Sequence, residues 1–176
     1  CTVHRKKQFG DQVIMESTPT FKPYTSGQEK FGEWFIKRFG HWQTRVYEWS
    51  GGRLWHKFLG VECAILTTTG RKSGAQRKIP LLYVRDGDRI VMAASKGGMT
   101  TMPLWYRNIE ANPEVWIQIG KHRRRYLARD ASEAEAEQLW PRLDAIYKGY
   151  AEYRARLEGK RRVPVIIFSP LDEADA

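Results

Sequence analysis

The chain has 176 residues, and its 30 Lys and Arg against 20 Asp and Glu give a formal net charge of +10. Its length predicts one domain, and its apolar runs are too short for a membrane-spanning helix. An aromatic content of 12% excludes a disordered chain, and two cysteines, Cys1 and Cys63, exclude a disulfide framework. The positive charge indicates an anionic partner: nucleic acid, an acidic membrane surface or an anionic small molecule.

The first 59 residues divide into a polar tail and an aromatic helical segment. Residues 1–27 contain no signal peptide, and we expect a poorly ordered tail with a native start at Met15 and added sequence before it. Residues 28–49 show helical periodicity, with Thr44 on one face and, on the other, Phe31, Phe35, Phe39, Trp42, Val46 and Trp49. We expect this aromatic face to pack on the domain or to lie on a membrane surface.

Residues 60–171 form the expected domain, in which short apolar strands alternate with turns. Strands are predicted at 62–69, 77–85, 89–95, 114–119, 123–130 and 163–168. The segments Asp86-Gly87-Asp88 and Gly120-Lys121-His122 are typical of hairpin turns.

Two helical regions lie between these strands. A short helix is predicted over 103–110, with Pro103 in its first turn. Ser132 and Glu135 form a capping box, which begins a helix that reaches about residue 157 and is interrupted near Pro141. Since no long helical crossover joins successive strands, the pattern predicts an α+β fold, an antiparallel barrel of about six strands with flanking helices.

Residues 67–78, TTTGRKSGAQRK, form a basic turn between two predicted strands. Arg71, Lys72, Arg77 and Lys78 lie within eight residues, and no acidic residue lies among them. A turn that exposes backbone N–H groups among cationic side chains binds anions. The segment is therefore either an anion site or a solvated basic turn.

Three further segments carry residue types that suit ligand binding. Residues 93–98, AASKGG, let a planar ligand approach the backbone, or they are a plain exit from a strand. Residues 103–108, PLWYRN, either cap a pocket or pack into the core through Trp105. Tyr147, Tyr150 and Tyr153 recur on roughly one side of a helix, and they either line a pocket or form an ordinary amphipathic face.

Several catalytic patterns are missing from the sequence. The histidines are scattered without metal-binding spacing, so no metal site is predicted. The chain has no GxGxxG motif for a dinucleotide and no recognised nucleic-acid-binding motif. Cys63 lies inside an apolar strand, and we expect it to be a small buried hydrophobic residue.

Four segments together resemble the deazaflavin (coenzyme F-420)-dependent nitroreductase family of mycobacteria and related actinobacteria. They are residues 66–84, 92–98, 103–120 and 125–135. The resemblance implies a split β-barrel related to flavin-mononucleotide (FMN)-binding barrels, and it implies coenzyme F-420, an 8-hydroxy-5-deazaflavin with a strongly anionic tail. The reduced ring would transfer a hydride from C5 to a planar acceptor such as a quinone or a nitroimidazole. FMN as the cofactor, or a deazaflavin carrier without catalysis, are the alternatives.

The resemblance also assigns roles to residues of this sequence. The positions that match cofactor-binding residues of the family are Arg71, Lys72, Ser73 and Arg77 for the tail, Ser95, Lys96, Gly97 and Gly98 for the phosphate and ring edge, Pro80, Leu81, Ala93 and Ala94 along the ring, and Leu104, Trp105 and Asn108 above it. The positions that match the substrate side are Leu82, Tyr147, Tyr150 and Tyr153. Tyr147 or Ser95 is the candidate catalytic proton relay. Leu82 stands where some members carry a tyrosine, so the reduction of nitro compounds is left open.

The partner expected from this resemblance is a small-molecule acceptor and not a nucleic acid. We expect a cytoplasmic protein, and the helix at 28–49 leaves peripheral contact with the membrane open. The physiological acceptor and the oligomeric state are not indicated by the sequence.

Overall fold

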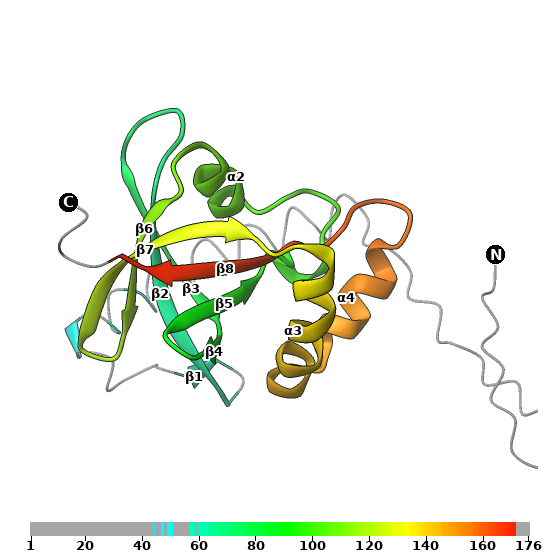
Figure 1. The fold of residues 1–176 in the computed structure, drawn as a ribbon. Helices are drawn as coiled ribbons and strands as arrows, with labels where there is room; N and C mark the ends of the chain where they lie inside the picture. Colours follow the sequence, from blue (N-terminus) through cyan, green and yellow to red (C-terminus); the bar gives the residue numbers. More distant parts are fainter. Residues whose placement is uncertain (1–43, 45–46, 48, 51–56, 59, 172–176) are drawn as a thin grey trace, which may run out of the picture.

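The computed structural model describes residues 44, 47, 49–50, 57–58 and 60–171, which form an antiparallel sheet with three α-helices beside it (Figure 1). The elements in chain order are β1 (Lys57–Phe58), β2 (Val61–Thr69), β3 (Gln76–Leu82), β4 (Val84–Asp86), β5 (Arg89–Ala93), the 3-10 helix η1 (Lys96–Gly98), α2 (Leu104–Ala111), β6 (Glu114–Ile119), β7 (His122–Asp130), α3 (Glu133–Ile146), α4 (Gly149–Leu157) and β8 (Val165–Pro170).

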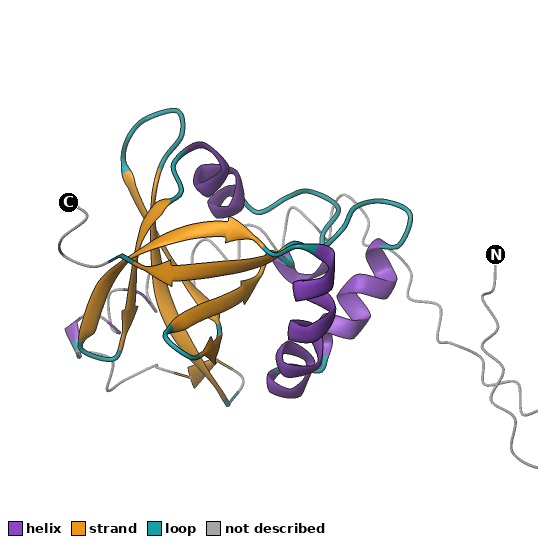
Figure 2. Cartoon of the chain, in the orientation of Figure 1, coloured by secondary structure: helices purple, strands orange, loops and turns teal. Residues whose placement is uncertain are grey.

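The sheet has the strand order β1-β2-β6-β7-β8-β5-β4, and β3 pairs with β2. β4 ends this path, and β3 lies beside β2 near the other end, yet β3 and β4 follow each other in the chain with only Tyr83 between them. The sheet therefore curls round on itself, as Figure 2 shows. The predicted α+β antiparallel barrel with flanking helices is confirmed.

The predicted strand at 77–85 is two strands, because the chain changes partners at Tyr83. β3 pairs with β2, with Cys63 opposite Leu82, whereas β4 pairs with β5. Together with the short β1, this division gives eight strands among the described residues instead of about six. Both predicted hairpin turns are present, since Asp86 pairs with Arg89 and Ile119 pairs with His122.

Two apolar clusters lie on opposite faces of the sheet. In β5, Ile90 and Met92 belong to the inner cluster, while Val91 and Ala93 belong to the outer one, against α3 and α4. β8 alternates in the same way. This explains why both strands are apolar at nearly every position: each of their faces is buried.

The helix α3 begins at the predicted capping box and continues past Pro141. The Ser132 N–H donates to Glu135 Oε2 at 2.8 Å, and the Glu135 N–H donates to Ser132 Oγ at 3.3 Å. The expected interruption near Pro141 is wrong, since the break lies at Tyr147. Pro141 removes one backbone hydrogen bond, whereas the helix buries Leu139 and Leu143 against the sheet.

Three described residues of the N-terminal segment are helical, and at Trp49 the aromatic face is exposed and does not pack on the domain. Thr44 and Tyr47 are buried, while Trp49 is 83% exposed. The Tyr47 hydroxyl donates to the Cys63 carbonyl at 3.4 Å and accepts from the Gly120 N–H at 2.7 Å. These bonds hold the helix with Tyr47 inward, so Trp49 points outward.

The remaining expectations for residues 1–27 and for most of 28–59 lie outside the described residues. Cys63 is buried, as expected. Within the described part of the chain, no helix has the length and apolar character needed to cross a membrane.

Candidate functional site

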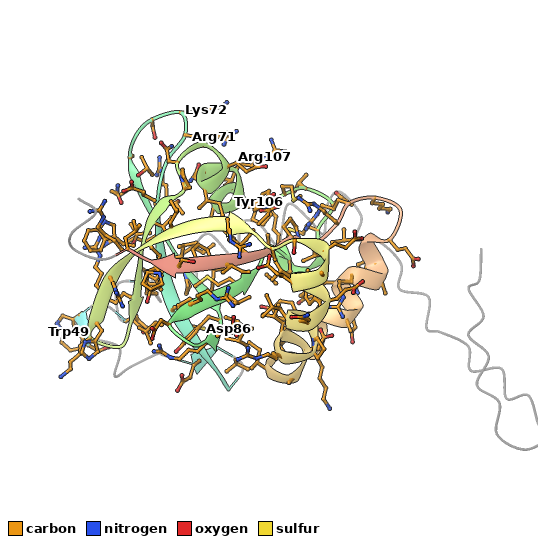
Figure 3. All side chains as sticks on the ribbon, viewed as in Figure 1. Trp49, Arg71, Lys72, Asp86, Tyr106 and Arg107 are labelled. Carbon is orange, nitrogen blue, oxygen red and sulfur yellow. The ribbon has the colours of Figure 1, made fainter. Side chains whose placement is uncertain are left out.

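The basic turn between β2 and β3 presents its cations to solvent. Arg71, Lys72, Ser73 and Arg77 are all exposed, and Figure 3 shows Arg71 and Lys72 at the end of the molecule beside α2. Gly74 has φ +67°, and its N–H donates to the Gly70 carbonyl at 2.7 Å. The turn is thus held by its own backbone, and its side chains form a cationic surface.

The backbone amides of this turn mostly point inward. The Ser73 N–H donates to the Gly70 carbonyl at 3.2 Å, and the Ala75 N–H donates to Ser73 Oγ at 3.4 Å. The Arg71 N–H donates to Asn108 Oδ1 at 3.2 Å. An anion at this turn would therefore contact side-chain cations more than the row of exposed N–H groups expected from the sequence.

Asn108 joins α2 to the basic turn. Its side chain is buried, and its Nδ2 donates to Thr68 Oγ1 at 3.1 Å while its Oδ1 accepts from the Arg71 N–H. Thr68, which sequence reasoning missed, is also buried. The resemblance places Asn108 over the cofactor. In the structure, its two hydrogen bonds connect α2 to the turn and to β2.

The loop after β5 has an unusual backbone. Lys96, Gly97 and Gly98 have φ values of 48°, 63° and 76°, so three successive residues occupy the left-handed region. Glycine adopts this region freely, but Lys96 does so at a cost. A Cβ added to Gly98 would lie 2.8 Å from Cδ1 of Tyr153. The predicted ligand loop is therefore strained and lies directly against α4.

Tyr147 and Tyr153 form a pair beside this loop. Their hydroxyl oxygens lie 2.8 Å apart, and their ring centroids are separated by 5.9 Å. Tyr150 is different: its side chain is 4% exposed and lies in the outer cluster, where burial raises the pKa of its hydroxyl. Leu82 packs against the same cluster. The structure thus brings Leu82 and the three tyrosines together, with Tyr150 as the supporting ring.

The residues expected along the ring differ in exposure. Ala93 and Ala94 have buried side chains, and Pro80 and Leu81 are half-buried. Trp105 is 6% exposed and belongs to the inner cluster, as the core-packing alternative predicted. Leu104, by contrast, is 61% exposed. Of the α2 residues assigned above the cofactor, Leu104 is therefore the one that presents an apolar surface.

A cavity of about 530 Å³ lies beside the basic turn and α2. Arg71, Arg107 and Arg162 line it together with Tyr106 and Glu110. The Tyr106 hydroxyl donates to an Asp130 carboxylate oxygen at 3.0 Å; burial and this hydrogen bond raise the pKa of Tyr106 to about 12. The cavity extends the cationic surface of Arg71, which favours an anionic ligand with several charged groups.

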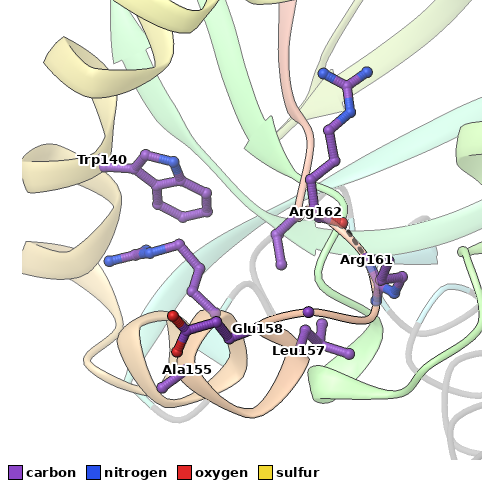
Figure 4. Close-up of a pocket in the computed structure, with 9 residues that line it drawn as sticks. Trp140, Ala155, Leu157, Glu158, Arg161 and Arg162 are labelled. Atoms are coloured by element: carbon purple, nitrogen blue, oxygen red, sulfur yellow. Dashed lines mark hydrogen bonds between the residues drawn. The ribbon is translucent and has the colours of Figure 1, made fainter. Parts of the chain in front are cut away.

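A second cavity, of about 550 Å³, lies between α3 and the end of α4 (Figure 4). The Arg154 guanidinium lies 3.9 Å from the Trp140 ring centroid and forms two hydrogen bonds with Asp144. The wall of this cavity includes Leu157 and Arg161 but none of the predicted cofactor residues. In the described part of the chain, no group of three or more His, Cys, Asp or Glu side chains could hold a metal ion.

The chemistry of the first site fits a polyanionic cofactor. An exposed group of cations without acidic neighbours in the turn can hold an anionic tail, and the glycine loop at 96–98 allows close approach of a ring. Sequence reasoning assigned neither Arg107 nor Arg161 to the cofactor site. Arg107 lies between the assigned Trp105 and Asn108. Arg161 lies in the basic run 160–162, which indicates a groove for the anionic tail, a membrane contact or solvated surface but not a contact with the Ser95 carbonyl.

Comparisons with known proteins agree with these observations. The family described as F420H(2)-dependent quinone reductase matches residues 40–170. One such reductase from Mycobacterium tuberculosis is 33% identical over 128 residues, which are 70% of this chain and 85% of that protein. A solved F420-H2 dependent reductase is 38% identical, with a TM-score of 0.56 over 61% of this chain and 93% of that chain. Another solved chain, described as a domain-swapped dimer, is 32% identical, with a TM-score of 0.57 over 78% of this chain and 98% of that chain. The chain belongs to the F420H(2)-dependent quinone reductase family.

Proposed function

We propose that the protein is a reductase that uses reduced coenzyme F-420 to transfer a hydride to a planar acceptor of the quinone type. The observation that supports this most directly is the exposed cationic turn at 71–77 in a chain of this family, which also carries the strained glycine loop at 96–98. When bound, the deazaflavin supplies the hydride chemistry. The residues of this chain bind it, orient it and handle the proton.

The cationic surface holds the anionic tail of the cofactor. Arg71, Lys72 and Arg77 make the first contacts, and Arg107 and Arg162 continue the surface along the neighbouring cavity. All of these side chains reach solvent, so their attraction is long-ranged and weakens with salt. The Ser73 hydroxyl already accepts from the Ala75 N–H and still has a proton to donate to a phosphate oxygen.

The ring of the cofactor is oriented by apolar and backbone surfaces. Pro80 and Leu81 on β3 and Leu104 on α2 provide side chains that are half-buried or exposed. Ala93 and Ala94 are small but buried, so the ring would meet the backbone of Ser95 to Gly98 at its edge. Trp105 supports α2 from the core.

The Tyr147–Tyr153 pair provides the proton that must follow the hydride. Because the hydroxyls lie 2.8 Å apart, one can donate to the acceptor while the other replaces the proton. Tyr147→Phe should lower kcat by about tenfold or more and leave the Kd of the cofactor within about twofold. Ser95→Ala is the competing variant. If Tyr147→Phe turns over normally and Ser95→Ala does not, Ser95 is the relay.

One binding experiment separates the proposed cofactor from FMN. Fluorescence titration of the same preparation with coenzyme F-420 and with FMN should give saturable binding of F-420 at lower concentration. Oxidation of the reduced cofactor is then followed after a quinone is added. Tight F-420 binding without turnover by any quinone or nitroimidazole would favour the carrier, and tighter FMN binding would favour an FMN enzyme.

We further propose that the protein is cytoplasmic and that its N-terminal helix brings it into contact with an acidic membrane face. The Tyr47–Gly120 hydrogen bond holds Trp49 near the β6–β7 turn, as Figure 3 shows, and Trp49 is 83% exposed. Trp116, which is 37% exposed, lies under Arg123 at 4.5 Å on the same hairpin. Exposed tryptophan with arginine suits a lipid interface.

Sedimentation with vesicles tests this contact. The full chain should bind vesicles that contain an anionic phospholipid and release at high salt, and Trp49→Ser should bind at least about fivefold more weakly. Trp140→Ser, away from the β6–β7 hairpin, is the matched control. Equal binding by Trp49→Ser and the wild type would remove this surface from consideration.

A further inference from the structure

Arg161 lies just beyond the end of α4 and reaches back across the molecule. The N–H groups of Lys160 and Arg161 donate to the Leu157 carbonyl at 2.9 and 3.1 Å, so the chain stays tightly turned after the helix. Gly159, with φ +72°, allows this turn. The turn after α4 places the Arg161 side chain against the loop that follows β5.

The Arg161 guanidinium binds carbonyl groups on both sides of the strained loop. Its Nη2 donates to the Ser95 carbonyl at 2.8 Å, its Nε donates to the Met99 carbonyl at 2.9 Å, and its Nη1 lies 3.3 Å from the Ala94 carbonyl. Nη1 also donates to the Arg162 carbonyl at 3.0 Å, as drawn in Figure 4. One planar side chain therefore fixes the entry to residues 96–98 and the exit from them.

The loop needs such support because its own backbone provides little. The 3-10 helix η1 has three residues, all of them with positive φ, and Lys96 is not a glycine. Its internal bonds run from the Gly98 N–H to the Ser95 carbonyl at 3.0 Å and from the Met99 N–H to the Lys96 carbonyl at 3.3 Å. Arg161 binds the same Ser95 carbonyl and, at Met99, the carbonyl of the residue whose N–H closes the second internal bond.

We propose that Arg161 is a positioning residue that keeps residues 95–98 in the conformation that binds the cofactor. This inference rests on the proposed function. α4 acts on the loop at two points, through the Tyr153 ring against Gly98 and through the Arg161 fork just beyond the helix end. Lysine cannot replace the arginine, since one ammonium group cannot reach three carbonyls with the geometry of a planar guanidinium.

Two substitutions and one control test the role of Arg161. Arg161→Lys keeps the charge, and Arg161→Gln removes it. Arg142→Gln is the control. Arg142, like Arg161, donates to a backbone carbonyl, which is that of Arg85, and it also donates to the Asp86 carboxylate, but it lies away from the loop. The readouts are hydrogen exchange of residues 95–102 without cofactor, the Kd of coenzyme F-420, and kcat and KM separately.

Loss of positioning should appear first in exchange and in affinity. The Gly98 and Met99 amides should exchange at least about tenfold faster in both Arg161 variants, and the Kd should rise about tenfold if the competent loop falls to a tenth of its population. At saturating cofactor, kcat should stay within about threefold of the wild type. Arg142→Gln should match the wild type in exchange of this loop and in Kd, even where its Tm falls.

Two results would overturn the proposal. One is unchanged hydrogen exchange of residues 95–102 in Arg161→Gln. The other is wild-type affinity for coenzyme F-420 in Arg161→Lys, which would mean that only the positive charge of Arg161 matters. The exchange measurement needs no cofactor. Failure of the wild type to bind coenzyme F-420 would therefore contradict the proposed function. The exchange result would still show whether Arg161 stabilises the loop.

Discussion

Asn108 is the residue whose removal should most clearly separate the basic turn from the rest of the site. Its side chain is 6% exposed, its Oδ1 accepts from the Arg71 N–H at 3.2 Å, and its Nδ2 donates to Thr68 Oγ1 at 3.1 Å. Asn108→Ala deletes both hydrogen bonds and keeps the helix propensity of α2 high. Among the described residues, the turn should then lose the side-chain hydrogen bond that connects it to α2.

The magnitude follows from the two groups left behind. The Arg71 N–H belongs to an exposed residue and can bind water, so its loss costs about 1 kcal/mol. The Thr68 hydroxyl is 1% exposed and keeps only a long bond of 3.5 Å to the Arg77 carbonyl. That loss costs about 2 kcal/mol, and a total of about 3 kcal/mol should lower the Tm by roughly 6–12 °C in a domain of this size.

Thermal and chemical unfolding of a double-mutant cycle measure this effect. Thr68→Val removes the other half of the buried pair, so the double variant should lose at least about 0.5 kcal/mol less than the sum of the single variants. The Kd of coenzyme F-420 should rise in Asn108→Ala because the turn is no longer fixed. A Tm within about 2 °C of the wild type, with additive effects, would refute the connection between α2 and the turn.

Three further predictions concern charge, packing and pH. Lys72→Ala with Arg77→Ala should raise the Kd of coenzyme F-420 about tenfold at low salt, with a smaller effect at high salt, when measured by fluorescence titration. Gly98→Ala, where the new Cβ would lie 2.8 Å from a tyrosine ring, should lower the stability to urea by at least about 1 kcal/mol more than Gly87→Ala, where the Cβ meets open space. Glu135 has a pKa lowered to about 2 from 4.5, first by the Arg129 guanidinium, so its stabilisation is complete above pH 4.5 and lost as the pH falls through 2. The Tm of Glu135→Gln should therefore be below that of the wild type at neutral pH and converge with it in acid.

The sequence predicted the parts of the fold that local patterns determine. The capping box at Ser132, the turns at Gly87 and Gly120, and the strand at 114–119 follow from local signals, and the structure contains all of them. The division of the strand at Tyr83 was not predictable in this way, because it depends on which strands the two halves pair with. Pro141 misled for a similar reason, since tertiary burial of its neighbours outweighs one lost hydrogen bond.

The site was predictable as residue types and less so as geometry. The cations of the turn and the glycines at 97 and 98 stand out in the sequence. In the structure the cations are exposed, and both glycines have positive φ. The inward direction of the Arg71 amide depends on Asn108, which follows Arg71 by 37 residues. Arg161 contacts a loop more than 60 residues earlier, so no spacing rule could have found it.

Oxidation of reduced coenzyme F-420 by a quinone tests the central claim most directly. The purified protein, the reduced cofactor and a water-soluble quinone are mixed without oxygen, and recovery of the absorbance of the oxidised deazaflavin is recorded. The proposed function predicts recovery that depends on the protein and the quinone and is slowed by Lys72→Ala with Arg77→Ala at subsaturating cofactor. No recovery above the protein-free rate with a range of quinones, from protein that binds the cofactor tightly, would contradict it.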